Sequence, residues 1–465
     1  MTISVSDLQP CETSPPDSRW RRIITPIPVP ESLPVIQRLR NVEAYSNSGM
    51  PPILWHEAEG FLIRDPYGNQ WIDLTSTIVM ANIGHGHPCV RAALHHAADA
   101  KLLATYAFPT EARLQLLEKL VAVSPIPDSK AILFSAGTEA TEAAIMLMRR
   151  QGQKIHPEKV GILSFADGYH GRTLAAGLAS GLAGPNDWIP RKSVRHYQIP
   201  FPFGPTCNYG NGPGHHCDEQ CFHQSLAVLE TNQIDPDLIA GFIGEPMPGW
   251  ATWPMTPSYA AAMKSWAQQH NILICFDEVQ SGCGRSGKFF AMEHVGVVPD
   301  LITLGKGLTS SVPVSAVIGR KQILDEPTPG EMSSTHGGNP VGAQVALASL
   351  KVLEEEELVL ASAQTGELLL AELQKLAVHF PEQILSVHGR GLFISIHLRK
   401  PGGCEPDIDL ANLIVAESVR RGVLMFGTGR GFLKIAPPLC IDPDAALEAA
   451  QVINDCFHHC VEESS

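Results

Sequence analysis

Between about Lys130 and Gly319, short apolar runs alternate with helical or loop segments. Six of these runs have the length and composition of buried strands: Ala131–Phe134, Gly161–Phe165, Leu238–Ile243, Ile272–Phe276, Leu301–Leu304 and Val314–Ile318. Strands that alternate with helices are typical of a largely parallel sheet with crossover connections. The pattern therefore predicts an α/β fold for this part of the chain.

The two flanking regions have a different pattern. Residues 1–50 are rich in Pro and Ser and predict an irregular arm with one short helix near Val35 to Val42. After about Pro340, helical periodicity is followed by two strand-like runs and a terminal helix, which indicates a smaller α+β domain. The strand-like runs are Gly391–Leu398 and Phe432–Ile435. The predicted divisions are an N-terminal arm (1–50), the first part of the small domain (51–90), a large domain (91–340) and the rest of the small domain (341–465).

Composition and charge narrow the class of protein. A chain of 465 residues with 44% hydrophobic and 18% charged residues can bury sizeable cores and predicts two or three domains. Its formal charge of -14 disfavours binding to nucleic acid or to an anionic membrane. No apolar run is as long as a membrane span, the first residues contain no secretory h-region, and eleven scattered cysteines favour reduced thiols. We therefore expect a cytoplasmic protein.

One segment within the large domain, from Pro200 to His223, is rich in Gly, Pro, Cys and His and predicts a surface loop insertion. Its side chains have metal-ligand chemistry, but the spacing C-x9-C-x3-C-x-H is not a standard zinc pattern. We therefore favour incidental thiols and expect no metal site. The residues concerned are Cys207, His215, His216, Cys217, Cys221 and His223.

Chemically useful side chains follow four of the predicted strands. Ligands of open parallel sheets bind beyond the carboxyl ends of the strands, so these side chains are expected to share one crevice. They are Asp277 after ILICF, Lys306 after LITLG, Tyr169 and His170 after GILSF, and Gly137 and Thr138 after AILF.

As a set, these groups fit pyridoxal phosphate (PLP) better than any other common cofactor. A lysine amine forms Schiff bases with carbonyl groups, and a carboxylate beside a pyridine nitrogen keeps that nitrogen protonated. An aromatic ring stacks on a planar heterocycle. The turn 135–138 opens a predicted helix, whose free N–H groups and dipole bind phosphate.

From about Gly60 to Pro438 the sequence resembles the class III aminotransferases, which are fold-type-I PLP enzymes. Lys306 follows Asp277 by 29 residues, which is the acid-to-lysine spacing of the family. The order and spacing of the motifs make the resemblance specific. They are GHGHP (84–88), SAGTEATEAA (135–144), FADGYHGRT (165–173), GEP (244–246), FDEVQSGCGRSGKFFA (276–291), PDLITLGKGL (299–308), THGGNP (335–340), GRGL (389–392) and APPL (436–439).

The resemblance implies a large PLP-binding domain with a mostly parallel, seven-stranded sheet, and a smaller α+β domain. It implies that Lys306 carries the cofactor as a Schiff base and moves the substrate proton, while Asp277 pairs with the pyridinium nitrogen. A homodimer with shared active sites is implied because Thr335 matches a threonine that reaches the phosphate of the neighbouring subunit. The other implied cofactor contacts are Val279 and Tyr169 on the two ring faces, Gln280 at the ring hydroxyl, Gly137 and Thr138 at the phosphate, and the buried Glu245.

Two positions depart from the 4-aminobutyrate, ornithine and acetylornithine aminotransferases. The residues that follow the Glu-Pro motif at Glu245 differ from those enzymes and include Trp250. Lys434 stands where those enzymes have an arginine that binds the α-carboxylate. Lysine offers no bidentate fork, so we expect carboxylates to be bound differently. Arg172 is the candidate for a distal carboxylate. Trp250, Ile78 and Val79 are candidate pocket-lining residues.

The leading hypothesis is a PLP-dependent aminotransferase with a ping-pong mechanism. The donor is expected to be an ω-amine or an amino acid, and the acceptor a 2-oxo acid. An amino-acid racemase or epimerase is the alternative on the same scaffold, because returning the proton from the opposite face requires no new residue type. A non-enzymatic protein on a dead scaffold is disfavoured by the intact Lys306, Asp277, Gln280 and Thr335.

Overall fold

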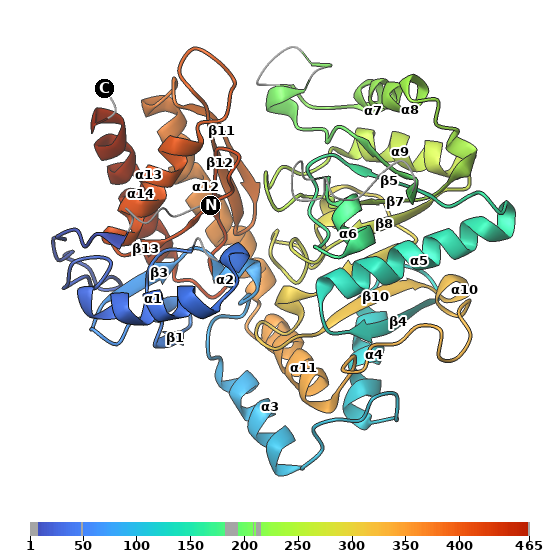
Figure 1. Cartoon of the computed structure of the whole chain (residues 1–465), viewed down its shortest axis with the longest axis horizontal. Helices are drawn as coiled ribbons and strands as arrows, with labels where there is room; N and C mark the ends of the chain where they lie inside the picture. Colours follow the sequence, from blue (N-terminus) through green and yellow to red (C-terminus); the bar gives the residue numbers. More distant parts are fainter. Residues whose placement is uncertain (1–7, 48–49, 182–193, 208, 211–214, 464–465) are drawn as a thin grey trace. The chain divides into compact units, whose positions relative to one another are not determined.

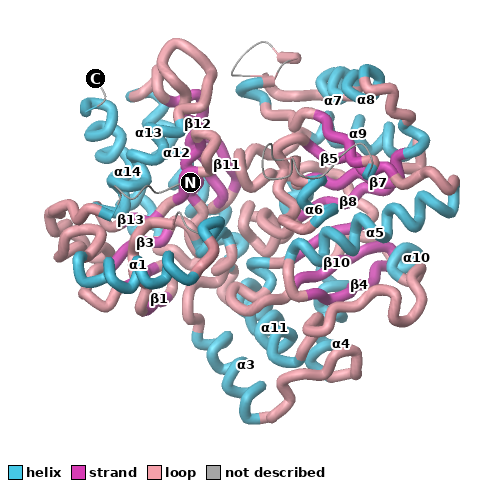
Figure 2. The backbone as a smooth tube through the Cα atoms, viewed as in Figure 1, coloured by secondary structure: helices cyan, strands magenta, loops and turns pink. Residues whose placement is uncertain are grey.

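The computed structural model describes residues 8–47, 50–181, 194–207, 209–210 and 215–463. The chain forms two compact units: Met1–His87 together with Ala361–Ser465, and Pro88–Leu360 (Figures 1 and 2). Among the described residues, no helix has the length and apolar character that crossing a membrane requires. The larger unit, Pro88–Leu360, contains the predicted strand-and-helix alternation.

A seven-stranded sheet forms the centre of the larger unit, which confirms the predicted α/β class. Four neighbouring pairs are parallel (β5–β6, β5–β7, β7–β8 and β8–β9), and β10 is antiparallel to both of its neighbours. The strands lie in the order β4 (Ser129–Phe134), β10 (Ser315–Arg320), β9 (Leu301–Leu304), β8 (Leu273–Asp277), β7 (Ile239–Gly244), β5 (Gly161–Phe165) and β6 (His196–Ile199).

Each of the six predicted runs overlaps one of these strands, whereas β6 was not predicted. The sequence of β6, HYQI, contains one aliphatic residue and therefore gives no apolar run. It is an edge strand whose two central residues, Tyr197 and Gln198, are only partly buried. An edge strand with one neighbour buries less apolar surface than a central strand, so its hydrophobic signal is weak.

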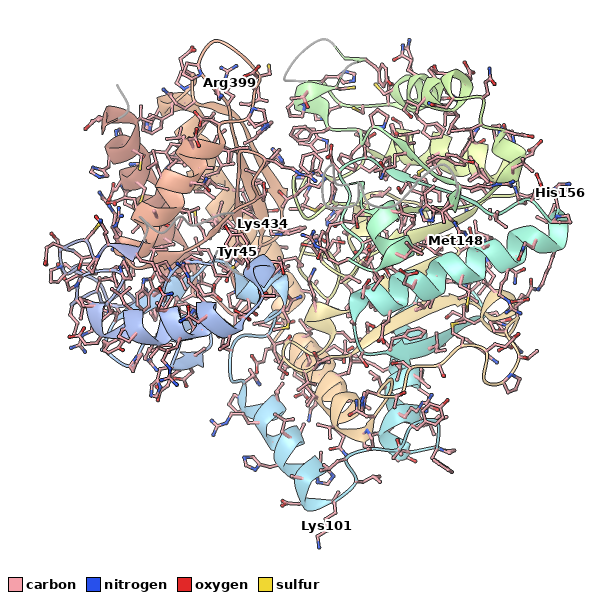
Figure 3. The ribbon with its side chains drawn as sticks, in the orientation of Figure 1. Tyr45, Lys101, Met148, His156, Arg399 and Lys434 are labelled. Carbon is pink, nitrogen blue, oxygen red and sulfur yellow. The ribbon has the colours of Figure 1, made fainter. Side chains whose placement is uncertain are left out.

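Helix α5 (Gly137–Ile155) packs against this sheet (Figure 1). Its buried face, which includes Leu147 and Met148, joins one apolar cluster with strand residues such as Ile162 and Ile243. Figure 3 marks Met148 on this helix. A Cβ at Gly241 of β7 would lie 2.3 Å from the Met148 sulfur, so the close contact between helix and sheet requires glycine there.

The remaining helices of the larger unit are α3 (Pro88–Asp99), α4 (Glu111–Val123), α6 (Leu174–Ala179), α7 (Glu219–Ser225), α8 (Ala227–Thr231), α9 (Pro257–Gln269), α10 (Lys321–Leu324) and α11 (Pro340–Glu355), followed by α12 (Leu358–His379), which extends beyond the unit. Some of these helices contact strands of the sheet, whereas α7 packs on α9 and α11 packs on α3 and α4. The prediction of a surface loop throughout 200–223 is wrong, because α7 begins inside it and Cys217 and Cys221 are buried.

The smaller unit has α+β structure with two four-stranded sheets. The first has the order β1 (Glu57–Glu59), β2 (Leu62–Arg64), β3 (Gln70–Asp73) and β13 (Val423–Leu424). The second has the order β11 (Ile384–Arg390), β12 (Phe393–Leu398), β15 (Phe432–Ile435) and β14 (Phe426–Gly427). The helices are α1 (Leu33–Val42), α2 (Ser76–Val79), α13 (Ile408–Arg420) and α14 (Pro443–Glu463).

The predicted N-terminal arm contributes to the core of this unit. Ile23, Ile27 and Val29 are buried in one cluster with Ile63 and Trp71. The predicted short helix is present as α1. The predicted strand at Gly391–Leu398 begins later, at Phe393, because Gly391 occupies a turn with a φ of +55° between β11 and β12.

Candidate active site

Six of the seven strands of the sheet in the larger unit run in the same direction and end at one edge of the sheet. The pairings give β4, β9, β8, β7, β5 and β6 a common direction, since β10 is antiparallel to both β4 and β9. The candidate side chains follow the carboxyl ends of these strands, as the sequence predicts. This edge is where parallel sheets bind their ligands.

Asp277, the last residue of β8, is the most firmly held of these side chains. It is 2% exposed. One carboxylate oxygen accepts a hydrogen bond from Nδ1 of His170 at 2.7 Å, and the other accepts bonds from Oγ1 of Thr303 at 2.9 Å and N of Val279 at 3.0 Å. A carboxylate offers about four acceptor positions. One position therefore remains for a further donor, such as a pyridinium N–H.

His170 is the hydrogen-bond partner of one oxygen of this carboxylate. Burial lowers the pKa of His170, but the hydrogen bond and charge of Asp277, together with the charge of Glu245, outweigh that effect and raise the pKa above its ordinary value. The backbone N–H of His170 donates to Oγ of Ser180 at 2.8 Å, which fixes the residue at the end of its loop. The sequence suggested His170 as part of the crevice but did not reveal its bond to Asp277.

Glu245 follows β7 and is also buried. One oxygen accepts the backbone N–H of Tyr169 at 2.9 Å, and the other accepts the backbone N–H of Gly249 at 2.9 Å. Burial raises the pKa of Glu245, opposed by the charge of His170 and by these two hydrogen bonds. Glu245 therefore connects the Tyr169 loop to the turn that leads to Trp250.

Lys306 lies two residues beyond β9, at the start of a short 3-10 helix (Lys306–Leu308). Its φ of +42° is in the left-handed region, which costs about 1–2 kcal/mol for a residue other than glycine. Burial lowers the pKa of Lys306 to about 8, against the opposing charges of Asp277 and Glu245. A substantial fraction of its amine is therefore neutral near physiological pH and able to act as a nucleophile or base.

Tyr169 presents a partly exposed ring to two cations. Nζ of Lys306 lies 6.0 Å from the centre of the ring, and Cζ of Arg172 lies 5.6 Å from it. The side chain is 37% exposed although its backbone is tied to Glu245. An aromatic ring that is anchored through its backbone and open on one side can stack on a planar ligand.

The first turn of α5 offers an anion site. Just before this turn, the backbone N–H groups of Ser135 and Ala136 donate to the Glu139 carboxylate at 2.7 and 3.1 Å. The N–H groups of Gly137 and Thr138 have no acceptor among the described residues. Because α5 has 19 residues, these two donors also stand at the positive end of a full helix dipole.

Two glycines keep this turn close to its neighbours. A Cβ at Gly137 would lie 3.0 Å from Cγ1 of Val279. Gly171 has a φ of +139°, and a Cβ there would lie 2.3 Å from Oγ1 of Thr138. The hydroxyl of Thr138 is 2.7 Å from that of Thr173. Because these two glycines have no Cβ, Gly137 can lie against Val279 and Gly171 against Thr138. The sequence motifs alone do not reveal these contacts.

Three other predicted residues of the larger unit differ from one another in their surroundings. Gln280 is buried, and a Cβ at Gly249 would lie 2.3 Å from its side-chain oxygen. Trp250 packs edge-on against Phe201 and Phe203, with ring centres 6.1 and 5.6 Å apart. Thr335 is exposed in a turn before α11.

Two predicted substrate residues belong to the smaller unit. Lys434 is buried on β15, with Nζ 5.6 Å from the centre of the Phe393 ring. Ile78 is 46% exposed and has a φ of +70°. It stands in α2, where all four residues from Ser76 to Val79 have positive φ, a conformation that strains β-branched side chains. Strained and exposed turns of this kind concentrate at functional sites.

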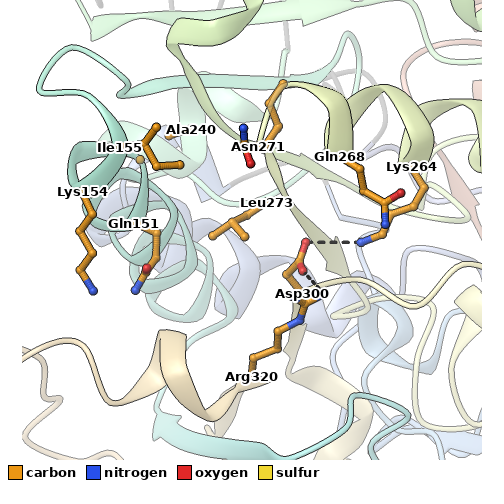
Figure 4. A pocket seen from close by; sticks show the side chains of 12 residues that line it. Gln151, Lys154, Ile155, Ala240, Lys264, Gln268, Asn271, Leu273, Asp300 and Arg320 are labelled. Carbon is orange, nitrogen blue, oxygen red and sulfur yellow. Dashed lines mark ion pairs between the residues drawn. The ribbon is translucent and has the colours of Figure 1, made fainter.

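A hollow at the opposite edge of the sheet is a different feature (Figure 4). Its volume is about 370 Å³, and its lining includes Ala240 and Leu273 near the amino ends of β7 and β8. Asp300 accepts ion pairs there from Lys264 at 3.6 Å and Arg320 at 2.6 Å. These paired charges anchor the start of β9. None of the candidate cofactor residues lines this hollow, so it is not the candidate active site.

Comparison with known proteins agrees with this arrangement. The family model for class-III aminotransferases matches residues 44–457. An alanine/serine racemase of Pyrococcus horikoshii is 30% identical and the alignment covers 93% of this chain and 92% of that protein. A mitochondrial ornithine aminotransferase of Oryza sativa subsp. japonica is 33% identical (91% and 85% covered), and a 4-aminobutyrate aminotransferase of Mycobacterium leprae is 30% identical (93% and 97%). Among solved structures, a Bacillus anthracis aminotransferase has a TM-score of 0.83 at 26% identity, covering 92% of this chain and 99% of that one.

Proposed function

The chain belongs to the class-III aminotransferase family and is an aminotransferase, and we propose that Lys306 and Asp277 are the residues with which it uses PLP. The observation that carries this proposal is that two unusual groups lie at the same edge of the sheet. One is an amine with a pKa of about 8, and the other is a buried carboxylate with one acceptor position left. PLP requires both an amine and an acid of this kind.

The donor set fits the cofactor at each of its polar groups. Gly137 and Thr138 supply N–H groups for the phosphate, Asp277 supplies an acceptor for the ring nitrogen, and Lys306 supplies the amine that binds the aldehyde carbon. Tyr169 and Val279 are assigned to the two faces of the ring, and Gln280 to its hydroxyl. When bound, PLP supplies an electron sink that stabilises negative charge on the substrate carbon.

The residues of this chain handle the proton movements. Asp277 would hold a proton on the pyridine nitrogen, and His170 donates a hydrogen bond to the Asp277 carboxylate. With PLP bound, the amine of Lys306 would accept the proton that leaves the substrate carbon and donate it again to complete the transfer. An amine with a pKa of about 8 is well matched to both halves of that task near neutral pH.

The active form is proposed to be a homodimer in the cytoplasm. Thr335 is exposed in a turn of the larger unit, which leaves its hydroxyl available to a phosphate bound in a second copy of the chain. None of the eleven cysteines, all within the described residues, is in a disulfide, as in proteins of reducing compartments.

For the substrate, we propose a donor that is an ω-amine or an amino acid and an acceptor that is a 2-oxo acid. Relatives named 4-aminobutyrate and ornithine aminotransferases support this class. Arg172 is assigned to a distal carboxylate because its guanidinium is exposed and lies over the Tyr169 ring. Trp250, Ile78 and Lys434 are assigned to substrate selection.

A donor panel tests the proposed function. Purified PLP-loaded enzyme is incubated with ω-amines and amino acids in the presence of pyruvate or 2-oxoglutarate, and the new amino acid is quantified. We expect stoichiometric transfer from at least one donor, and we expect Arg172→Ala to raise KM for dicarboxylic or ω-carboxylic substrates by about 10-fold or more, as the loss of one charged contact would. An unchanged KM for every carboxylate would remove Arg172 from the site.

Racemisation is a second candidate function, favoured by the 30% identity to an alanine/serine racemase. The proton that Lys306 removes could then return to the same carbon from the other face. The two activities differ in their products: racemisation in D2O gives the deuterated opposite enantiomer without consuming a 2-oxo acid. Chiral chromatography of single amino acids incubated with the enzyme separates the two outcomes.

A further inference from the structure

A second group of reactive side chains lies in the larger unit, outside the proposed active site. The ligand atoms of Cys207, His215, Cys217 and Cys221 all lie within 4.8 Å of one another. Cys207 follows a 3-10 turn (Gly204–Thr206), while Cys221 is in the first turn of α7. Residues up to 14 positions apart in the sequence are thus gathered at one point.

The local fold that gathers them is well defined. Asp218 caps α7 by accepting the backbone N–H of Cys221 at 3.1 Å, which places Cys217 and Cys221 on either side of the helix start. The carbonyl of Cys217 accepts a hydrogen bond from Oγ1 of Thr256, and Thr256 itself caps α9. Cys217 is 1% exposed and Cys221 is 3% exposed. Two of the four side chains are therefore buried in the packed structure, while Cys207 and His215 are partly buried.

The separations are those of ligands around one ion. Nε2 of His215 is 3.1 Å from Sγ of Cys221, and the sulfurs of Cys207 and Cys221 are 4.0 Å apart. In a tetrahedral zinc site with Zn–S bonds of about 2.3 Å, sulfur atoms lie about 3.8 Å apart. A disulfide would require about 2.05 Å. The three thiols also line a small hollow of about 50 Å³.

We propose that Cys207, His215, Cys217 and Cys221 bind one Zn²⁺ ion in a closed, structural site. Three thiolates and one imidazole form a full tetrahedral set, which leaves no open position for substrate or water. Thiolate-rich sets select zinc over hard cations such as Mg²⁺ and Ca²⁺. The ion therefore stabilises the fold locally and takes no part in the chemistry at Lys306.

The segment that the ion would cross-link also supports one wall of the proposed active site. Phe203 precedes Cys207 by four residues and contacts both Trp250 and Trp253, with ring centres 5.6 and 5.5 Å apart. Trp250 follows the Glu245 turn, whose Gly249 N–H is bound by Glu245. Zinc at the cluster would hold the Phe203 segment in place against Trp250.

The spacing C-x9-C-x3-C-x-H did not resemble a zinc site because it counted a histidine that is not in the cluster. His223 is two residues after Cys221 on α7, and residues two apart on a helix do not face the same side. Its Nε2 lies instead 3.6 Å from Glu219, and its side chain is 55% exposed. His215, from within the Gly-rich segment, takes the fourth position. The expectation of no metal site is therefore replaced by this proposal.

The test measures zinc by elemental analysis of the full-length, PLP-loaded enzyme purified without chelators from zinc-supplemented medium. We expect about one zinc ion per chain. His215→Ala and Cys221→Ser are each expected to lower the zinc content at least about fivefold. The matched controls, His223→Ala on the same helix and Cys404→Ser at an exposed thiol, are expected to keep it.

A second readout requires no variant. Zinc should protect three thiols from a disulfide reagent under native conditions, and a chelator should expose these thiols and lower Tm by about 5 °C or more. Wild-type enzyme without zinc, a Cys207–Cys221 disulfide found by peptide mass analysis, or equal zinc loss in the His223→Ala control would overturn the proposal. Lys306→Ala should retain zinc, so a failure of the proposed transamination chemistry leaves this result unaffected.

Discussion

Lys306→Ala lowers kcat for transamination by at least about 10⁴-fold, which is the largest effect that we expect from any single substitution. The variant loses the amine that we propose binds the cofactor aldehyde and moves the substrate proton. Steady-state rates with the best donor of the panel measure the loss of activity. Borohydride reduction followed by peptide mapping measures the loss of the covalent adduct, which in the wild type is expected on the peptide that contains Lys306.

The matched control is Lys321→Ala, which removes an exposed lysine of the same unit. It should retain both the activity and the adduct on Lys306. Thermal unfolding of the two variants checks that the fold is kept, because alanine and lysine carry a similar strain at the φ of +42°. Trapping of the adduct on any lysine other than Lys306 would refute the assignment.

The depressed pKa of Lys306 gives a further expectation for the enzyme stripped of cofactor. Below its pKa of about 8 the amine is protonated and not nucleophilic, so the rate of PLP capture should fall about tenfold for each pH unit. Above that pH the rate should level off. A lysine with the ordinary pKa of 10.5 would instead give a rate that rises up to about pH 10. Stopped-flow absorbance between pH 6 and 10 distinguishes the two profiles.

The sequence predicts most strands of the sheet and the candidate residues at their ends because both depend on local features. Five of the six apolar runs are central strands and the sixth is the edge strand β4; Asp277 directly follows one of these runs, and Lys306 follows another by two residues. The direction of a parallel strand then fixes the edge at which those side chains appear. Lys306 and Asp277 were therefore assigned correctly to one edge without any knowledge of tertiary contacts.

Other features depend on contacts between distant residues, and the sequence could not supply them. The bond between His170 and Asp277 joins positions 107 residues apart, and nothing local to either residue indicates it. The Cys/His cluster depends on the Asp218 cap, which turns Cys221 toward Cys207 and turns His223 away. The left-handed turn at Ile78 follows no sequence rule, since residues other than glycine rarely adopt it.

The buried acid at the end of β8 is the second position at which we expect a large effect. Asp277→Asn should lower kcat by about 10³-fold, comparable with the loss of one preorganised electrostatic contact in other enzymes. Asparagine has nearly the same shape and can still accept bonds from Thr303 and Val279. It carries no charge, so it cannot hold a proton on the pyridine nitrogen or raise the pKa of His170.

The loss of activity should therefore come from the missing charge. The pKa of His170 distinguishes this cause from a loss of packing. Removing the carboxylate should lower the pKa of His170, because only the charge of Glu245 then opposes the effect of burial on its imidazolium. NMR titration of this histidine reports that shift independently of catalysis.

The matched control is Asp300→Asn, which changes another buried acid of the same unit. Asp300 pairs with Lys264 and Arg320 at the opposite edge of the sheet, so its substitution should reduce Tm while leaving kcat within about threefold of the wild type. If Asp277→Asn changed kcat no more than this control does, the carboxylate would have no role at the ring nitrogen. The 29-residue spacing to Lys306 would then reflect only the fold. A large loss confined to Asp277 would instead mean that the charge at the end of β8 gives the cofactor its capacity to accept electrons.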